Sequence, residues 1–265
     1  MISKETMATL RRLALDAGTR IMEIYDGGDL DVRAKDDASP VTAADEAADA
    51  VIAAGLRDAF PEAPVVTEEQ AATHDIEARS FFIVDPLDGT KEFVARRGEF
   101  TVNIAWVEED TPRLGVIYAP AVKRLFWTTG DGGAVEERGP FDPDVVGATV
   151  PLRAATPDGK LSVVASKSHR SPELEDYIAR YDVGDSRSAG SSLKFCLVAT
   201  GEAHFYPRLG PTMEWDTAAG DAILRAAGGR VVRADDHEPL AYGKPGFRNP
   251  HFIAHAPDVA LAPLG

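Results

Sequence analysis

Cysteine is nearly absent from this chain, which has one cysteine, Cys196, among 265 residues. A single cysteine excludes an internal disulfide, so nothing in the composition indicates secretion. Cys196 stands between Phe195 and Leu197 in an apolar run. We therefore expect a buried thiol in the core rather than a nucleophile.

Basic residues are also scarce. The chain has 28 lysines and arginines against 43 aspartates and glutamates, which gives a formal net charge of −15. An acidic protein repels a phosphate backbone, so we expect no binding to a nucleic-acid polymer. A small phosphorylated molecule is still compatible with this charge, because bound divalent ions and a few nearby cations can reverse the field at one site.

Long apolar runs are missing as well. No stretch approaches the roughly twenty apolar residues that cross a bilayer, so we expect no transmembrane segment. The first residues, 1–5, lack the charged-then-apolar pattern of a secretory signal, and we expect a cytoplasmic protein. Peripheral association with the inner membrane stays open, as does the choice between a monomer and a homodimer.

The first half of the chain is expected to contain two helices and a sheet. Apolar positions recur at helical spacing from Leu10 to Ile24, which predicts a helix that ends at Gly27-Gly28, and a second helix is expected after Thr42. Short β-branched or aromatic runs then predict a mostly antiparallel sheet. Its expected strands are residues 65–67, 81–84, 100–107, 114–118 and 124–129.

The order of expected strands and helices changes after the Gly- and Pro-containing stretch of residues 139–159, where strands and helices begin to alternate. Strands are expected at 162–165 and 203–206, and helices at 171–181 and 191–200. A chain of this length forms either one two-lobed unit or two small domains. We expect an N-terminal α+β lobe over residues 1–150 and a C-terminal α/β lobe with a mixed sheet over residues 151–265.

The most informative stretch is residues 81–93, with the sequence FFIVDPLDGTKEF. Here an apolar run ends at two carboxylates, Asp85 and Asp88, with Pro86 between them. Because proline lacks a backbone donor and fixes φ, we expect the strand to stop and turn, so that both carboxylates converge. Oxygen ligands of this kind suit Mg²⁺. The alternative is an Asp-rich turn that only ends a strand.

Acidic residues also stand at the ends of other expected elements. Glu68-Glu69 follows a short β-branched run. Asp216 precedes a run of small residues closed by glycine, where we expect it to be a helix N-cap. Asp45 lies in the first turn of an expected helix, a position that the helix dipole alone also favours for an acid.

Three segments carry a resemblance to a known family: Thr67-Glu68-Glu69, residues 85–90 and residues 215–220. In sequence, order and spacing they resemble the motifs of the inositol monophosphatase superfamily of Mg²⁺-dependent, lithium-sensitive phosphatases. Within it, residues 88–104 and 190–208 are most similar to the bacterial 3′(2′),5′-bisphosphate nucleotidases. The resemblance extends from Ser39 to about Phe252.

The resemblance implies a layered αβαβα sandwich, the inositol monophosphatase-like (sugar phosphatase) fold with two lobes, which periodicity alone does not predict. It implies two to three Mg²⁺ ions per active site, with most ligands in the N-terminal lobe. The implied ligands are Glu68, Asp85, the carbonyl of Leu87, Asp88 and Asp216. Glu69 and Asp45 would join Glu68 in supporting a weaker third ion.

The same resemblance implies the catalytic and binding residues. Asp45 and Thr90 are similar to a carboxylate–hydroxyl pair that orients the attacking water, and Glu68 is grouped with them as catalytic. The implied substrate-binding residues are Gly89, Thr90, His169, Gly190, Ser191, Lys194, Arg208 and Asp216, with Ser192 as a further candidate. Lys91 and Glu92 are expected to shape the near side of the pocket.

The implied reaction removes the 3′-phosphate of 3′-phosphoadenosine 5′-phosphate and gives AMP and phosphate, with the sulfated analogue as a second candidate substrate, in sulfate assimilation. The expected partner is thus a small-molecule nucleotide. The alternatives are an inositol-1-phosphate or fructose-1,6-bisphosphate phosphatase, and a non-catalytic metal or nucleotide sensor. Lys194 and Arg208 favour the nucleotide, and the combination of Thr90, Asp45 and Glu68 argues against a sensor.

Overall fold

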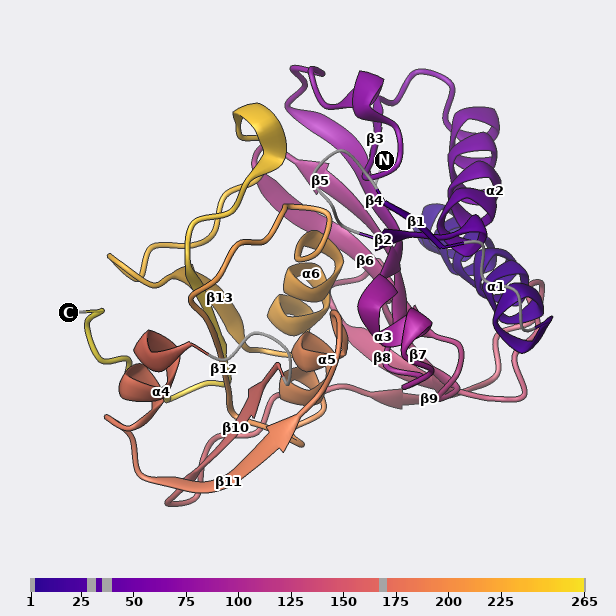
Figure 1. Ribbon diagram of the computed structural model, residues 1–265. Coiled ribbons are helices and arrows are strands. Elements are labelled where there is room, and N and C mark those ends of the chain that lie inside the picture. Colours follow the sequence, from indigo (N-terminus) through magenta and orange to yellow (C-terminus); the bar gives the residue numbers. More distant parts are fainter. Residues whose placement is uncertain (1–2, 28–31, 35–39, 167–170, 265) are drawn as a thin grey trace.

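A computed structural model gives the fold and describes residues 3–27, 32–34, 40–166 and 171–264. Figure 1 shows two β-sheets separated and flanked by helices. None of the helices described combines the length and the apolar composition that crossing a bilayer requires. The helices are α1 (Lys4–Gly27), α2 (Ala43–Ala59), α3 (Thr90–Val94), α4 (Pro172–Ile178), α5 (Leu193–Ala199) and α6 (Ala218–Ala226), with the short 3₁₀ helices η1 (Ala71–Thr73) and η2 (Pro245–Phe247).

The larger sheet has seven strands in chain order, and only its first pair, β3 with β4, is parallel. These strands are β3 (Val65–Thr67), β4 (Ser80–Asp88), β5 (Thr101–Glu108), β6 (Thr111–Ala119), β7 (Arg124–Thr128), β8 (Ala134–Arg138) and β9 (Ala148–Pro151). The mostly antiparallel sheet expected from the sequence is therefore confirmed. A two-stranded ribbon of β1 (Arg33–Ala34) and β2 (Pro40–Val41) lies apart from it.

The smaller sheet is mixed, as expected, and has the strand order β11-β10-β12-β14-β13. β10 is parallel to both of its neighbours, and the other pairs are antiparallel. Its strands are β10 (Leu161–Ala165), β11 (Val183–Ser188), β12 (Phe205–Arg208), β13 (Arg230–Arg233) and β14 (Phe252–His255).

Helices and sheets alternate in five layers. α1 and α2 pack on one face of the seven-stranded sheet, α5 and α6 lie between the sheets, and α4 packs on the five-stranded sheet. Adjacent residues of β12 point to opposite faces of the five-stranded sheet. Phe205 stacks on Tyr177 of α4, whereas Tyr206 contacts Phe195 of α5. The expected αβαβα sandwich is thus confirmed, and the division into lobes at residue 150 stays a prediction.

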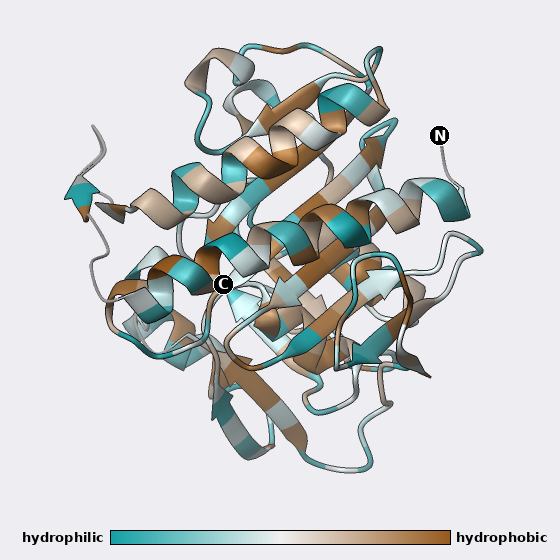
Figure 2. Cartoon of the chain, turned by 90° about the vertical axis from the view of Figure 1, so that its right-hand side faces the viewer, coloured by the Kyte–Doolittle hydropathy of each residue, from teal (hydrophilic) through white to brown (hydrophobic). Residues whose placement is uncertain are grey.

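Apolar faces explain this packing. Leu10, Ala14 and Ile21 of α1 are fully buried, and Figure 2 shows α1 and α2 lying across strands rich in hydrophobic residues. On the opposite face, α6 approaches the sheet closely at Gly115 of β6. A Cβ at Gly115 would lie 2.5 Å from the carbonyl oxygen of Ala219, so glycine is required there.

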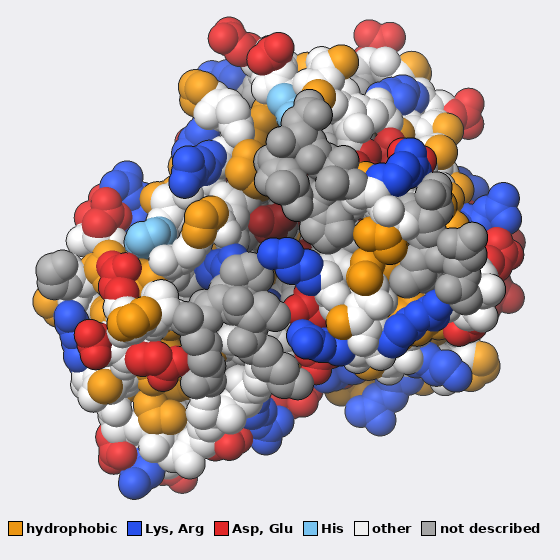
Figure 3. Space-filling view, in the orientation of Figure 1, with side chains coloured by type: hydrophobic (Ala, Val, Ile, Leu, Met, Phe, Trp, Pro, Cys, Tyr) orange, Lys and Arg blue, Asp and Glu red, His pale blue; other side chains and the backbone are white. Residues whose placement is uncertain are grey.

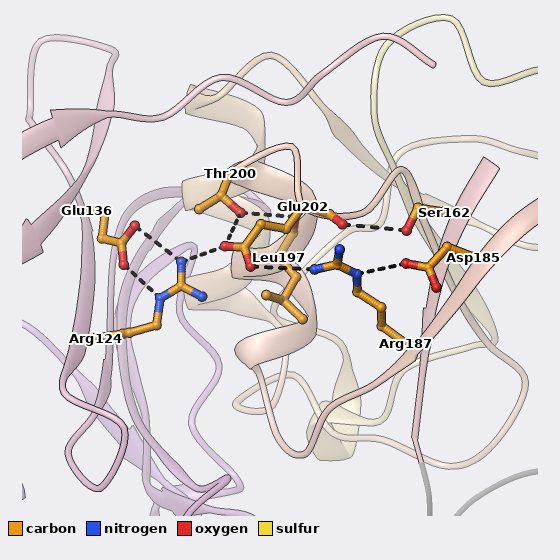
Figure 4. A network of polar contacts seen from close by, with 8 residues as sticks. All are labelled: Arg124, Glu136, Ser162, Asp185, Arg187, Leu197, Thr200 and Glu202. Carbon is orange, nitrogen blue, oxygen red and sulfur yellow. Dashed lines mark hydrogen bonds and ion pairs between the residues drawn. The ribbon is translucent and has the colours of Figure 1, made fainter. Parts of the chain in front are cut away.

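A network of charges joins the two sheets on the side of α5 (Figure 4). Arg124 of β7 contacts Glu136 of β8 at 2.7 Å and also Glu202, beyond the end of α5, at 2.7 Å. Burial acts to raise the pKa of Glu202, but the hydrogen bonds from Arg124 and Thr200 and the charges of Arg124 and Arg187 together outweigh it, and the pKa is lowered. Arg187 of β11 lies 3.9 Å from the same carboxylate and 2.9 Å from Asp185.

Some expected boundaries were wrong. The strand expected to stop at Pro86 continues to Asp88, and its register with β5 shifts between Asp85 and Asp88. Proline is tolerated there because a bulge does not need its missing donor. α1 includes Gly27, whereas Gly28 lies outside the described residues. β11 was not expected, because this edge strand is polar and mostly exposed and shows no alternation.

Candidate active site

Three acidic side chains converge from both halves of the chain. Asp85 lies near the end of β4, Glu68 follows the parallel neighbour β3, and Asp216 precedes α6. One carboxylate oxygen from each of these residues lies within 4.8 Å of the others. We call Glu68, Asp85 and Asp216 the acid cage. Parallel pairing of β3 and β4 explains how the first two meet, because both strands end at the same edge of the sheet.

Burial and mutual repulsion make the acid cage electrostatically costly. Burial raises the pKa of Asp85 well above its usual value, and the charges of Glu68, Asp88, Asp216 and Glu69 raise it further. Burial and the charges of Asp88 and Glu68 raise the pKa of Asp216 in the same way. A divalent cation would relieve this repulsion, and an all-oxygen set of donors fits Mg²⁺.

The bulge in β4 places the remaining predicted ligands. The backbone N–H of Leu87 donates to Asp85 Oδ1 at 3.0 Å, which fixes that carboxylate. Asp88 accepts a hydrogen bond from the Ser192 hydroxyl at 2.8 Å. Burial raises the pKa of Asp88, although the positive charge of Lys194 opposes the shift. The structure thus brings all the predicted ligand residues into one region, while their roles as ligands stay a prediction.

Asp216 is not a helix N-cap, which corrects the expectation from the sequence. Thr217 is the capping residue of α6, and Asp216 Oδ2 instead accepts from the N–H of Met213 at 2.8 Å. The carboxylate therefore folds back over its own loop, leaving it beside Glu68 and Asp85 rather than on the helix end.

Two buried residues that the sequence analysis missed hold this loop. Asn249 donates from Nδ2 to the carbonyl of Met213 at 2.7 Å and to Thr217 Oγ1 at 3.0 Å. Glu214, which is fully buried, accepts from the N–H groups of Gly243 at 2.6 Å and Lys244 at 3.0 Å. No sequence signal identifies them, because their partners are about thirty residues away along the chain.

Asp45 and Thr90 form a direct pair, as the resemblance implied. Thr90 Oγ1 donates to Asp45 Oδ1 at 3.1 Å. Asp45 Oδ2 accepts from the backbone N–H of Thr42 at 2.7 Å and from its hydroxyl at 2.6 Å, which completes a capping box at the start of α2. The acid is therefore a capping residue of α2 as well as a partner of Thr90.

A cavity of about 230 Å³ opens beside the acid cage. Figure 3 shows acidic side chains deep in a hollow near the centre of this face, with Lys and Arg side chains around it. Predicted site residues that line the cavity are Glu68, Asp88, Gly89, Thr90, Lys91, Glu92, Ser191, Ser192, Lys194, Arg208 and Asp216. Asp45 and Asp85 are buried behind this lining.

Two cations give this cavity an anion-binding character. Lys194 is buried, and its ammonium donates to the carbonyl oxygens of Ser191 and Ala189. Burial lowers the pKa of Lys194 to about 8, although the charge of Asp88 opposes the shift. Arg208 donates from Nη2 to the carbonyl of Pro211 at 2.9 Å, while its buried Nε has no partner among the described residues.

Of the predicted binding residues that the structure describes, Gly190 does not line the cavity. Gly190 packs against Glu99, where a Cβ would lie 2.5 Å from the Glu99 carbonyl oxygen, and its N–H donates to Glu99 Oε2 at 3.1 Å. Close approach of the backbone therefore accounts for this glycine, and a contact to substrate stays a prediction. His169 lies outside the described residues.

The five αβαβα layers, with the acid cage beside a cavity that Lys194 and Arg208 line, define a class of layered α+β proteins. The chain belongs to the inositol monophosphatase family, whose model matches residues 3–261. The resemblance drawn from the three motifs is thereby confirmed.

Relatives of known structure or name refine this assignment. The chain is 45% identical to 3′(2′),5′-bisphosphate nucleotidase CysQ of Salmonella typhimurium over 245 residues, which are 89% of this chain and 96% of the relative. It is 46% identical to the protein of that name from Escherichia coli K12, over 91% of this chain and 96% of the relative. CysQ from Bacteroides thetaiotaomicron superposes with a TM-score of 0.82 at 41% identity, covering 96% and 97% of the two chains.

Proposed function

We propose that this protein is a Mg²⁺-dependent 3′(2′),5′-bisphosphate nucleotidase that converts 3′-phosphoadenosine 5′-phosphate to AMP and phosphate. The main supporting observation is that the acid cage adjoins a cavity lined by buried Lys194 and by Arg208, whose Nε has no hydrogen-bond partner in the described part of the chain. Carboxylates that hold metal ions are compatible with many phosphate esters. Additional cations beside them favour a substrate that carries a second phosphate. Relatives that are 45–46% identical over most of their length are named 3′(2′),5′-bisphosphate nucleotidase, which supports the assignment.

The acid cage, Asp88 and the Leu87 carbonyl would hold the metal ions. Mg²⁺ bound there would lower the pKa of a coordinated water and neutralise charge on the transferred phosphoryl group. The convergence of three carboxylates within 4.8 Å fits such ions, because carboxylates this close repel one another without a cation.

Thr90 and Asp45 would orient the attacking water. Because the Thr90 hydroxyl donates its only proton to Asp45, its lone pairs face outward and can accept a hydrogen bond from water. Thr42 holds Asp45 through two further hydrogen bonds, so the pair is fixed before substrate binds. A water that donates to Thr90 would keep a lone pair free to attack the phosphorus.

A panel of four compounds tests the proposed function. Phosphate release with Mg²⁺ is measured from 3′-phosphoadenosine 5′-phosphate, inositol 1-phosphate, fructose 1,6-bisphosphate and 5′-AMP. The proposal predicts turnover of the bisphosphonucleotide with a kcat/KM that exceeds the others by at least tenfold. Faster turnover of inositol 1-phosphate or fructose 1,6-bisphosphate would instead assign one of the sister activities, and no turnover of any of the four would contradict the proposal. Assimilation of sulfate is the proposed context, because it generates this nucleotide.

Arg208→Met is expected to raise KM for the bisphosphonucleotide by roughly 10–100-fold with kcat changed less than threefold, because a ground-state contact to one phosphate is lost. The measurement is steady-state phosphate release at saturating Mg²⁺. Arg233→Met is the matched control, since Arg233, the last residue of β13, makes an exposed ion pair with Asp235. An unchanged KM for the Arg208 variant would remove this residue from the binding set.

Lithium is expected to inhibit turnover at millimolar concentration. Li⁺ is close to Mg²⁺ in size but has half the charge, so on the carboxylates it would not activate water to the same extent. Phosphate release is measured against LiCl at fixed Mg²⁺, with NaCl at equal ionic strength as the control. Equal rates in the two salts would count against a lithium-sensitive site.

A further inference from the structure

Asp88 lies where the backbone alone does not fix its side chain. It follows the point at which the register of β4 with β5 shifts, so the regular ladder is interrupted between Asp85 and Asp88. A carboxylate at a bulge needs side-chain contacts to define its direction. Ser192 supplies such a contact to Asp88, and Asn103 in turn donates to Ser192; both residues are buried and lie outside β4.

Ser192 joins three separate parts of the chain. Its hydroxyl lies 2.8 Å from Asp88 Oδ2 and 2.6 Å from the carbonyl oxygen of Asp216, and it accepts from Asn103 Nδ2 at 2.9 Å. The side chain is 2% exposed, so these contacts are not exchanged for bulk water. Since the hydroxyl has one proton for two acceptors, its hydrogen-bonding capacity is already committed within the protein.

Asn103 supports this arrangement from β5. It is 1% exposed and pairs across the sheet with Asp85, which places it beneath the bulge. The amide of Asn103 on β5 therefore holds the Ser192 hydroxyl, and this hydroxyl contacts Asp88 from the segment that begins α5.

We propose that Asn103 and Ser192 are positioning residues that hold the Asp88 carboxylate in place for a divalent ion, and that Ser192 does not contact the nucleotide. The inference rests on the metal site of the proposed function. Partners of metal-ligating groups orient them, and their removal typically weakens metal affinity or activity by about 10–100-fold. It reassigns Ser192, which the sequence analysis placed with the substrate-binding candidates.

The test compares Ser192→Ala and Asn103→Leu with the wild-type chain after removal of metal. Isothermal titration with MgCl₂ is expected to give a Kd raised roughly 10–100-fold in each variant. Phosphate release should need correspondingly more Mg²⁺, while KM for the bisphosphonucleotide at saturating Mg²⁺ stays within twofold.

Thr101→Val is the matched control, because Thr101 is buried two residues earlier on β5 and its hydroxyl has no partner among the described residues. Its Mg²⁺ Kd should stay within twofold of the wild type.

Two results would overturn the proposal. One is an unchanged Kd for Mg²⁺ in the Ser192 variant, and the other is a raised KM for nucleotide with normal Mg²⁺ binding, which would make Ser192 a substrate contact. If Asn103→Leu does not fold, Ser192→Ala decides the question, since it removes a single oxygen. Should the wild-type protein bind Mg²⁺ yet release no phosphate from the nucleotide, the proposed function fails, and the comparison of Kd values still tests the positioning roles.

Discussion

Asp88→Asn is expected to lower kcat for the bisphosphonucleotide by at least about 10³-fold, because a neutral amide cannot replace a carboxylate that holds a divalent ion. Because asparagine has nearly the shape of aspartate, the loss of kcat would result from the missing charge rather than from altered packing. Asp88 lies in the cavity, accepts from Ser192 and adds to the repulsion within the acid cage. Phosphate release at several Mg²⁺ concentrations measures the loss.

The same variant should be more stable than the wild type when metal is removed. The charge of Asp88 raises the pKa values of Asp85 and Asp216, so neutralising it relieves repulsion in the folded state. In EDTA we expect the midpoint of thermal unfolding to rise by roughly 2–4 °C. Asp235→Asn, on an exposed side chain, is the control and should retain full activity. More than a tenth of wild-type turnover in the Asp88 variant would contradict its role.

Thr90→Val should reduce kcat by roughly 10²–10⁴-fold with little change in KM, because it removes the hydroxyl that orients water and keeps the β-branched shape. The hydroxyl is held by Asp45 at 3.1 Å, so its loss also leaves that buried carboxylate with one hydrogen bond fewer. Steady-state kinetics with the bisphosphonucleotide at saturating Mg²⁺ is the measurement.

Thr90→Ser distinguishes the contribution of the hydroxyl from that of the methyl group, because serine keeps the first and lacks the second. Serine can donate the same hydrogen bond to Asp45, so its kcat should stay within about tenfold of the wild type. Equal losses in the valine and serine variants would show that Thr90 contributes packing rather than water orientation. Binding of Mg²⁺, measured by titration, should be similar in both variants, because the Thr90 side chain is not a predicted ligand.

The sequence placed acidic residues at the ends of expected elements, and the structure brings three of them together. Glu68 and Asp85 were placed at the ends of expected strands, and they lie close together because β3 and β4 are parallel neighbours, a pairing that the sequence analysis did not predict. The role given to Asp216 as a helix cap was wrong, because the loop before α6 bends the side chain back to Met213. Hydrogen bonds within a loop of this kind depend on its conformation, which residue type does not determine.

The buried residues that position the site's acidic side chains could not be predicted from one sequence. Ser192 and Asp88 are 104 residues apart, and Asn103 and Ser192 are 89 residues apart, so no local pattern links them. The order of the layers was likewise available only from the family resemblance. Periodicity missed β11, whose residues are mostly exposed, since an alternating pattern requires one buried face.

Crystals soaked in MnCl₂, with anomalous diffraction recorded at the manganese edge, test the central claim most directly. Mn²⁺ replaces Mg²⁺ at oxygen sites and gives a signal that water does not. We predict at least one anomalous peak within about 2.5 Å of carboxylate oxygens from Glu68, Asp85 and Asp216 together. Anomalous peaks elsewhere in the molecule, with none among these three residues, would contradict the account.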